Sequence, residues 1–497
     1  MAGISNNNNF QKVLILSIGQ ILEKAIVFFF KPYLSRTLNI QDFGSYSQVL
    51  FIGDFLLIFF TLGITQTFYV FLAKDNTSRK EIVSAFLLIG LMSGLLSVAC
   101  NLILTFTLSD IFKNPELKNI LWIYCCYPLF TILNLILQLL LLFDNKSRRL
   151  VTINVFVNLF KVICVVIVTQ LSQNTLPKII FIVGFAAPLF TMLLYGHQLS
   201  YSVFKIKTSF SLIKKILKDT LPVGLTIIMG GAYFYANGFV VNAVLGIEKY
   251  AIFINGIIDI PFISTLYTTI ATITLTNYTT LIKDKNFLEV IKLKRYTIAQ
   301  TASLVYPIAL ILLFFSEELI TTYLSNKYIA SVPVFMVYTL ILFLRVTDYN
   351  DVLITMGKQS LLVKYYTFFF LTIFFNSWLL TKYFGIIGSA FAVTASCYLI
   401  YFFLLRSMAA MLNASLSEII NWRSLLFTIL ISLIVIIPCT LIGHFFALKI
   451  WSKLTMIPFV LLIIYMSLVK SKFISLAMYK PLLDKVPFGK KIETILS

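Results

Sequence analysis

The chain has few charged residues, which make up only 12% of its 497 positions, and it has only two histidines and six cysteines. Hydrophobic residues make up 59% of the sequence, and the mean hydropathy is +0.93. A soluble multidomain protein could not bury that much apolar surface. The composition therefore predicts an integral membrane protein.

Signals for a metal site, a nucleotide site or a catalytic centre are also missing. The cysteines all lie in apolar runs without metal-ligand spacing, so they are interpreted as packing residues. His197 and His444 stand far apart near the ends of apolar runs, which is typical of interfacial residues. No glycine-rich phosphate loop is present, so the chain is not expected to be an ATP-driven pump. No cofactor or metal is predicted.

Long apolar runs separated by charged or turn-forming breaks dominate the sequence. A bilayer core about 30 Å thick requires about 20 apolar residues per helix, and no alternating pattern of a membrane barrel occurs. The fold class expected is an all-α membrane protein with about fourteen transmembrane helices. The predicted spans are residues 11–34, 43–72, 82–106, 119–142, 150–171, 178–200, 220–243, 250–278, 297–316, 332–356, 365–382, 386–405, 425–446 and 454–470.

The lysines and arginines predict the orientation. With the N-terminus inside, 27 of the 40 fall on the cytoplasmic side, Lys294 among them, nine fall outside and four lie within spans. Both termini are therefore expected in the cytoplasm. The net charge of +20 is spread over every second loop, which indicates contact with anionic membrane lipids. Binding of nucleic acid is not expected. The N-terminal segment does not resemble a cleavable signal peptide.

The four cations within spans are Lys24, Lys31, Lys161 and Arg345. A charge at membrane depth costs about 3 kcal/mol on insertion scales and usually faces a protein-lined or watery interior. These four are therefore predicted to bind an anionic cargo in a cationic central cavity. Lys31 could instead reach the outer interface, and Arg345 could pair with Asp348 on the same helical face.

Carboxylates within the spans are candidates for coupling transport to an ion. Burial raises the pKa of a carboxyl group towards the range in which it can load and release protons. The candidates are Glu23, Asp54, Asp259 and Asp348, each of which could equally be a structural ion-pair partner. Asp351 is placed near the cytoplasmic end of its span and is expected to be solvated. The choice between H⁺, Na⁺ and movement driven by the membrane potential alone stays open.

An internal repeat indicates two similar halves. Residues 38–46, which join spans one and two, align without gaps to residues 245–253, which join spans seven and eight, at an offset of 207 positions. The offset covers six spans, so both halves have the same orientation. The expected organisation is an N-terminal six-helix lobe and a pseudo-symmetric C-terminal six-helix lobe, joined by an amphipathic basic linker and followed by two extra helices and a basic tail. The boundaries are 1–200, 201–219, 220–406 and 407–497.

Three stretches carry a family resemblance. The run from Pro32 to Ser47, PYLSRTLNIQDFGSYS, followed by Leu62-Gly63-Ile64, resembles the opening of Wzx-type polysaccharide flippases. Residues 210–222 are similar to the amphipathic entry to the seventh helix of that family, and Met356-Gly357-Lys358 to its tenth-helix exit. Two positions depart from the pattern: Asn39 replaces a glycine, and Asn237 stands where many relatives carry an acidic residue, so a proton site in the seventh helix is in doubt.

The resemblance implies membership of the multidrug/oligosaccharidyl-lipid/polysaccharide exporter superfamily and a cargo of undecaprenyl-pyrophosphate-linked oligosaccharide. Polysaccharide polymerase and chain-length proteins are the partners it suggests. Two related alternatives stay open: a flippase for the lipid-linked peptidoglycan precursor and a cation-coupled multidrug antiporter. A membrane polymerase or ligase is disfavoured, because the outer loops, about residues 107–118 and 317–331, are too short to fold over a donor. The chain is not expected to be an enzyme.

Overall fold

A computed structural model of the chain describes residues 2–74, 79–172, 175–199, 208–258, 260, 263 and 277–471. These residues form helices and connecting turns, and no β-strand occurs among them. The chain divides into two compact units, Met1–Ile254 and Asn255–Ser497. The predicted all-α membrane fold is confirmed, whereas the boundaries drawn for the lobes and the linker stay predictions.

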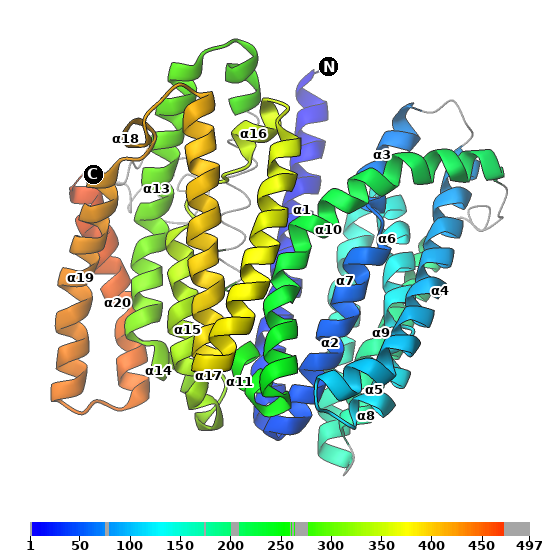
Figure 1. Ribbon diagram of the computed structural model, residues 1–497, viewed down its shortest axis with the longest axis horizontal. Helices are drawn as coiled ribbons and strands as arrows, with labels where there is room; N and C mark the ends of the chain where they lie inside the picture. The colour runs from blue at the N-terminus through cyan, green and yellow to red at the C-terminus, as the bar shows by residue number, and fades with distance from the viewer. Residues whose placement is uncertain are drawn as a thin grey trace. The chain divides into compact units, whose positions relative to one another are not determined.

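Unit 1 contains the helices of the first seven predicted spans and most of α11, which begins the eighth (Figure 1). Its buried apolar core joins the side chains of α3, α4, α6, α7, α9 and the start of α10, among them Phe68, Phe86, Ile136 and Leu140. The elements are α1 (Ala2–Thr37), α2 (Ile40–Phe60), α3 (Ile64–Lys74), α4 (Arg79–Ile111), α5 (Leu117–Tyr124), α6 (Tyr127–Phe143), α7 (Ser147–Leu171), α8 (Leu176–Phe181), η1 (Ile182–Ala186), α9 (Ala187–Gln198), α10 (Phe210–Leu245) and α11 (Ile247–Gly256).

The second predicted span is broken between α2 and α3 by a left-handed turn. Leu62 and Gly63 have φ angles of 51° and 75°. A side chain at Gly63 would meet the backbone nitrogen of Gly224 in α10, 2.7 Å from its Cβ. Glycine at positions 63 and 224 therefore lets the backbone of the turn lie in direct contact with the backbone of α10.

The predicted amphipathic linker and the seventh span form one helix. Ser209 caps α10 by accepting a hydrogen bond from the Leu212 backbone N–H, and the helix then continues through Pro222 to Leu245. Proline removes one backbone donor and bends a helix, and Figure 1 shows α10 changing direction along its length. Residues 201–207 of the predicted linker lie outside the described residues.

Unit 2 contains the remaining helices, and its C-terminal pair packs against α13. Tyr465 on α20 donates a hydrogen bond to the Leu304 carbonyl of α13, and the apolar side chains of α13, α19 and α20 form one core. The last two predicted spans therefore dock on this unit. The elements are α13 (Phe287–Phe314), α14 (Ser316–Tyr323), η3 (Asn326–Ser331), α15 (Val332–Thr339), η4 (Leu340–Phe343), α16 (Asp351–Thr355), α17 (Gln359–Met411), α18 (Leu416–Ile419), α19 (Trp422–Phe445) and α20 (Ile450–Lys470).

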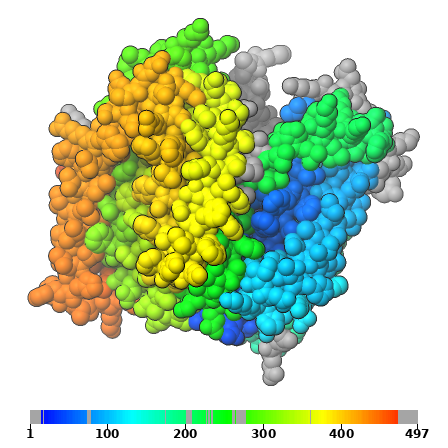
Figure 2. Space-filling model, in the orientation of Figure 1, coloured from blue at the N-terminus to red at the C-terminus, as the bar shows by residue number. Residues whose placement is uncertain are grey.

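Helix α17 is a hairpin that contains two predicted spans. Its backbone reverses at Gly385, which has a φ of 61°, and the Tyr365 and Ser407 hydroxyls lie 2.6 Å apart on the two limbs. Figure 2 shows the limbs, yellow and amber, forming much of one face of unit 2. Phe368, Phe375 and Phe391 are exposed on α17, as expected of a surface that contacts lipid.

Ten helices in the described part of the chain are long and apolar enough to cross a membrane. One of the ten is the α17 hairpin, which accounts for two crossings. Helices α1 and α10 coincide with two further predicted spans, and most of the predicted span 250–278 lies outside the described residues. The multi-pass membrane architecture is therefore established, and the number fourteen stays a prediction.

Candidate functional site

The middle of unit 1 holds a polar cluster built by α1, α7 and α9. The Glu23 carboxylate accepts a hydrogen bond from the Asn154 side chain and lies within electrostatic range of the Lys161 ammonium. The Tyr195 hydroxyl donates to Asn154 Oδ1 and so orients its amide towards Glu23. Two residues that the sequence assigned to different roles, Glu23 to coupling and Lys161 to cargo binding, are thus brought together.

Lys161 is held in a defined position at the centre of α7. Its Nζ donates to Asn158 Oδ1 at 2.9 Å, and the Asn158 amide donates in turn to the Asn154 backbone carbonyl one turn earlier. The side chain as a whole is half-buried. A lysine ammonium carries three N–H donors, and one of them is used by the neutral amide of Asn158. This geometry suits a group that also contacts an anion.

The two other cations predicted on α1 have different surroundings. Lys24 is exposed near the middle of the helix. Lys31 is half-buried, and its Nζ donates to the Ile254 carbonyl at 3.0 Å. That carbonyl belongs to the last turn of α11, where a cation interacts favourably with the helix dipole. Lys31 therefore stabilises the end of α11 in this conformation.

Asp54 lies in an aromatic environment near the middle of the segment formed by α2 and α3. Its carboxylate is exposed and accepts a hydrogen bond from the Tyr127 hydroxyl at 3.4 Å. The hydroxyls of Tyr46, Tyr124 and Tyr235 are within electrostatic range. A carboxylate at this depth cannot face lipid tails without a large free-energy cost, so it requires water, a cation or a polar partner.

The predicted span 332–356 is not a continuous helix, which corrects the expectation for Arg345 and Asp348. The α-helical backbone ends at Thr339, a 3-10 turn follows to Phe343, and residues 344–350 are not helical. Asp348 Oδ1 accepts a hydrogen bond from the backbone N–H of Asn350, 2.9 Å away. Such side-chain to backbone bonds compete with helix formation, so Arg345 and Asp348 do not share a helical face. Arg345 instead lies within electrostatic range of Cys397 and Tyr401 on α17.

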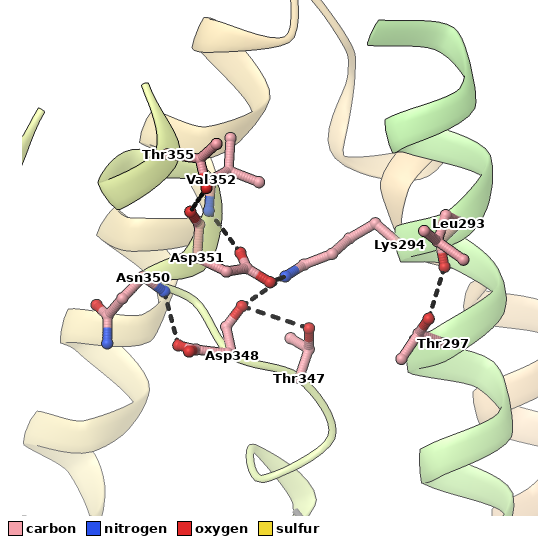
Figure 3. A network of polar contacts seen from close by, with 9 residues as sticks. All are labelled: Leu293, Lys294, Thr297, Thr347, Asp348, Asn350, Asp351, Val352 and Thr355. Atoms are coloured by element: carbon pink, nitrogen blue, oxygen red, sulfur yellow. Dashed lines mark hydrogen bonds and ion pairs between the residues drawn. The ribbon is translucent and has the colours of Figure 1, made fainter. Parts of the chain in front are cut away.

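A buried ion pair that the sequence did not reveal fixes this interrupted segment (Figure 3). The Lys294 ammonium of α13 contacts Asp351 Oδ2 at 2.6 Å and the Asp348 carbonyl at 2.5 Å. The exposed fractions are 0% for Lys294 and 1% for Asp351. The expectations that Lys294 lies in a cytoplasmic loop and that Asp351 is solvated are therefore wrong. The remaining coupling candidate, Asp259, lies outside the described residues.

The arrangement of helices and charges is characteristic of one class of membrane protein. Among helices of bilayer length, opposite charges meet in the protein interior, and the predicted span 332–356 is interrupted after Phe343. Broken helices and buried ionisable pairs of this kind are typical of secondary transporters. A group of three or more metal-ligating side chains is absent from the described ranges.

Comparison with solved structures gives the same fold. Lipid II flippase MurJ in an inward closed conformation superposes with a TM-score of 0.69 at 17% identity, covering 95% of this chain and 100% of MurJ. An inward-facing multidrug resistance MATE family transporter of the MOP superfamily superposes with a TM-score of 0.61 at 14% identity, covering 81% of this chain and 99% of that transporter. No curated protein sequence matches the chain.

The family follows from the sequence of the first half. The family described as polysaccharide biosynthesis protein matches residues 10–276, more than half of the chain, and the chain belongs to it. Membership of this family confirms the expectation that the chain is a flippase of the exporter superfamily and not an enzyme. It does not identify the cargo.

Proposed function

We propose that this protein moves an undecaprenyl-pyrophosphate-linked oligosaccharide from the cytoplasmic to the outer leaflet of a bacterial inner membrane by alternating access. The family description, polysaccharide biosynthesis protein, supports a glycan cargo. The Wzx-like residues between Pro32 and Ser47 support the same family of cargo. Both termini would face the cytoplasm, and polymerase or chain-length proteins would take up the product.

The observation that carries this proposal is the Lys161 ammonium at the centre of α7. A lipid-linked pyrophosphate brings negative charge into the hydrocarbon layer, where only a desolvated cation or hydrogen-bond donors can replace its hydration. The Lys161 ammonium supplies both a positive charge and N–H donors. The side-chain oxygen of Asn158 fixes its position by accepting a hydrogen bond at 2.9 Å. Glu23 serves as the counter-ion while no cargo is bound, and the phosphates then compete with it for the ammonium.

The remaining cations would assist in different ways. Lys24 and Arg345 would add positive charge along the route of the phosphates. Lys31 would contact the cargo once its bond to the Ile254 carbonyl is released. The carboxylates Glu23, Asp54, Asp259 and Asp348 are the groups through which H⁺ or Na⁺ would couple to the movement.

Two alternative cargoes have support from particular observations. The fold shared with the lipid II flippase MurJ supports a lipid-linked peptidoglycan precursor, which carries the same pyrophosphate. The exposed Asp54 carboxylate beside Tyr127 supports an organic cation, because carboxylates and aromatic faces bind cations together. The second alternative would make the protein a multidrug antiporter.

Reconstitution in liposomes separates these functions. The purified protein is expected to move a fluorescent polyprenyl-pyrophosphate glycan between leaflets, and Lys161→Ala or Arg345→Ala is expected to slow this movement at least tenfold. Lys292→Ala is the matched control, because Lys292 is an exposed lysine paired only with Glu289 at the start of its own helix in the described structure.

The possible outcomes assign the cargo. Movement of lipid II in preference to the glycan would identify the peptidoglycan precursor as cargo. Efflux of organic cations without lipid movement would favour the antiporter. Equal rates for wild type and Lys161→Ala would refute the role given to Lys161.

A further inference from the structure

The interrupted segment 344–350 of unit 2 is held by tyrosine hydroxyls that bond one backbone carbonyl and one side-chain oxygen of the segment. The Tyr349 hydroxyl donates to the Leu344 carbonyl at 2.9 Å, and the Tyr366 hydroxyl donates to Asn350 Oδ1 at 3.0 Å. Non-helical backbone at membrane depth is tolerated only where its polar groups find such partners. The Asp348 carbonyl is satisfied differently, because its partner is a charged group from another helix.

That charged group is completely enclosed. The Lys294 ammonium meets a carboxylate oxygen of Asp351 at 2.6 Å, the Asp348 carbonyl at 2.5 Å and the ring of Tyr278, whose centroid is 5.0 Å away. The side chain of Lys294 is 0% exposed, so these three groups replace the water shell of the ammonium.

The three groups are also those that bind a small free cation. Carboxylate and backbone carbonyl oxygens are ligands of hard cations, and an aromatic face attracts a desolvated positive charge. In transporters, unwound backbone segments supply carbonyl ligands of this kind to monovalent ions. Asp351 contributes one full negative charge to the contact, which matches a monovalent occupant.

We propose that residues Asp351, Asp348 and Tyr278 form a binding site for a small monovalent cation, and that the ammonium of Lys294 occupies it as a permanently attached ion. Figure 3 shows Lys294 extending from α13 to this point beside α16. The attached cation holds the interrupted segment against α13, so unit 2 adopts this conformation without a free metal ion at the site. A variant with a shortened side chain at position 294 exposes the vacant site to Na⁺, K⁺ or methylammonium.

This inference goes beyond the proposed function, and its test does not use transport. Wild type and Lys294→Ala are purified as full chains, and thermal unfolding is measured at equal ionic strength in sodium, methylammonium or N-methyl-D-glucamine chloride. N-methyl-D-glucamine is much larger than the ammonium group of Lys294 and serves as the cation that is not expected to bind. Lys294→Ala is expected to unfold at lower temperature in N-methyl-D-glucamine and to regain about 5 °C or more in sodium or methylammonium, in a saturable manner. Wild type is expected to gain clearly less from sodium or methylammonium than Lys294→Ala does, because its own ammonium already fills the site.

The double variant Lys294→Met/Asp351→Asn is the matched control. It removes both charges and keeps similar side-chain volumes, so it is expected to fold and to show no more cation dependence than wild type. Equal midpoints of Lys294→Ala in all three salts would overturn the proposal. Failure of Lys294→Ala to fold in any of them would overturn it as well, because a free cation would then be unable to replace the ammonium.

Discussion

Gln41 and Glu248 occupy equivalent positions of the internal repeat and hydrogen-bond to each other. Gln41 Nε2 donates to Glu248 Oε1 at 2.7 Å across 207 residues of sequence, the same offset that aligns the two repeats. Helix α2 begins at Ile40 and α11 at Ile247, again 207 residues apart. Equivalent residues of the two repeats are therefore in direct contact in the structure.

Gly44 makes the packing of these helix starts possible and is the subject of the first prediction. A Cβ at Gly44 would lie 2.6 Å from Ile247 Cγ1 and 2.8 Å from the Ile247 carbonyl oxygen. Gly44→Ala is therefore expected to destabilise the protein by about 1–3 kcal/mol, despite the higher helix propensity of alanine. Thermal unfolding in detergent measures the effect.

Gly443→Ala in α19 is the control for this substitution. Its new Cβ would meet the nearest heavy atom, Lys453 Cγ, only at 3.5 Å, which is ordinary contact. It is expected to leave the unfolding midpoint unchanged or slightly raised. Equal unfolding midpoints for Gly44→Ala and Gly443→Ala would show that α2 and α11 can move apart without loss of stability, against the prediction.

A second prediction concerns the buried amides that connect α2 and α10. Gln48 Nε2 donates to Asn242 Oδ1 at 2.8 Å, and Asn114 Nδ2 donates to Gln48 Oε1 at 2.8 Å. Gln48→Leu leaves both partners without these bonds, and each unsatisfied buried group costs about 1–3 kcal/mol. The unfolding midpoint is expected to fall clearly. Gln41→Leu, which removes the exposed hydrogen bond to Glu248, is expected to change the free energy of unfolding by about 0.5 kcal/mol or less. Equal loss of stability in Gln41→Leu and Gln48→Leu would contradict the prediction that the buried hydrogen bonds of Gln48 stabilise the protein.

The third prediction separates stability from transport at Lys161 and Glu23. Lys161→Met leaves a carboxylate without its cation at membrane depth, so it is expected to lower the unfolding midpoint. Adding Glu23→Gln is expected to restore most of the stability, with a coupling of about 1 kcal/mol in a double-mutant cycle. Flipping of the glycolipid is expected to stay slow in the double variant, because the phosphates have lost their cation. A double variant that flips lipid at the wild-type rate would mean that the pair is purely structural.

A fourth prediction concerns the pH dependence of α18, which lies between membrane spans. The Ser415 backbone N–H and hydroxyl donate to the Glu418 carboxylate at 2.6 and 2.9 Å, and these hydrogen bonds lower the pKa of Glu418 below its ordinary value of 4.5. The folded pKa is below the unfolded one, so the cap stabilises the turn at neutral pH and is lost as the pH falls through the folded pKa.

Hydrogen exchange of the 415–418 amides checks the prediction for α18. Protection factors, corrected for the intrinsic rate, are expected to fall on acidification in wild type and to be low and nearly constant in Glu418→Gln. The same pH profile in both proteins would rule out the carboxylate as the cause.

Lys294 illustrates why part of the candidate site could not be predicted. It follows a run of cations from Lys283 onwards, which is typical of a cytoplasmic loop, yet α13 begins already at Phe287 and buries Lys294. The partner, Asp351, is 57 residues away in sequence. One signal was present: the run Thr347-Asp348-Tyr349-Asn350-Asp351 contains several turn-forming residues and is a poor candidate for the middle of a helix.

Local hydropathy and the repeat determined most of the architecture. The apolar runs fixed where the chain crosses the membrane, because an uninterrupted hydrocarbon layer accepts only helices of sufficient apolar length. The equivalent starts of α2 and α11 were visible as a nine-residue alignment, since a connection between helices depends on local turn geometry.

Tertiary structure alone decided which intramembrane charges meet. Nothing in the sequence around Lys161 or Lys294 identifies Glu23 or Asp351 as the neighbouring carboxylate. Their proximity depends on how α1 packs beside α7 and how an interrupted span packs beside α13. A buried charge is stabilised by whichever opposite charge the packing brings within a few ångströms, and that distance is set by the fold as a whole.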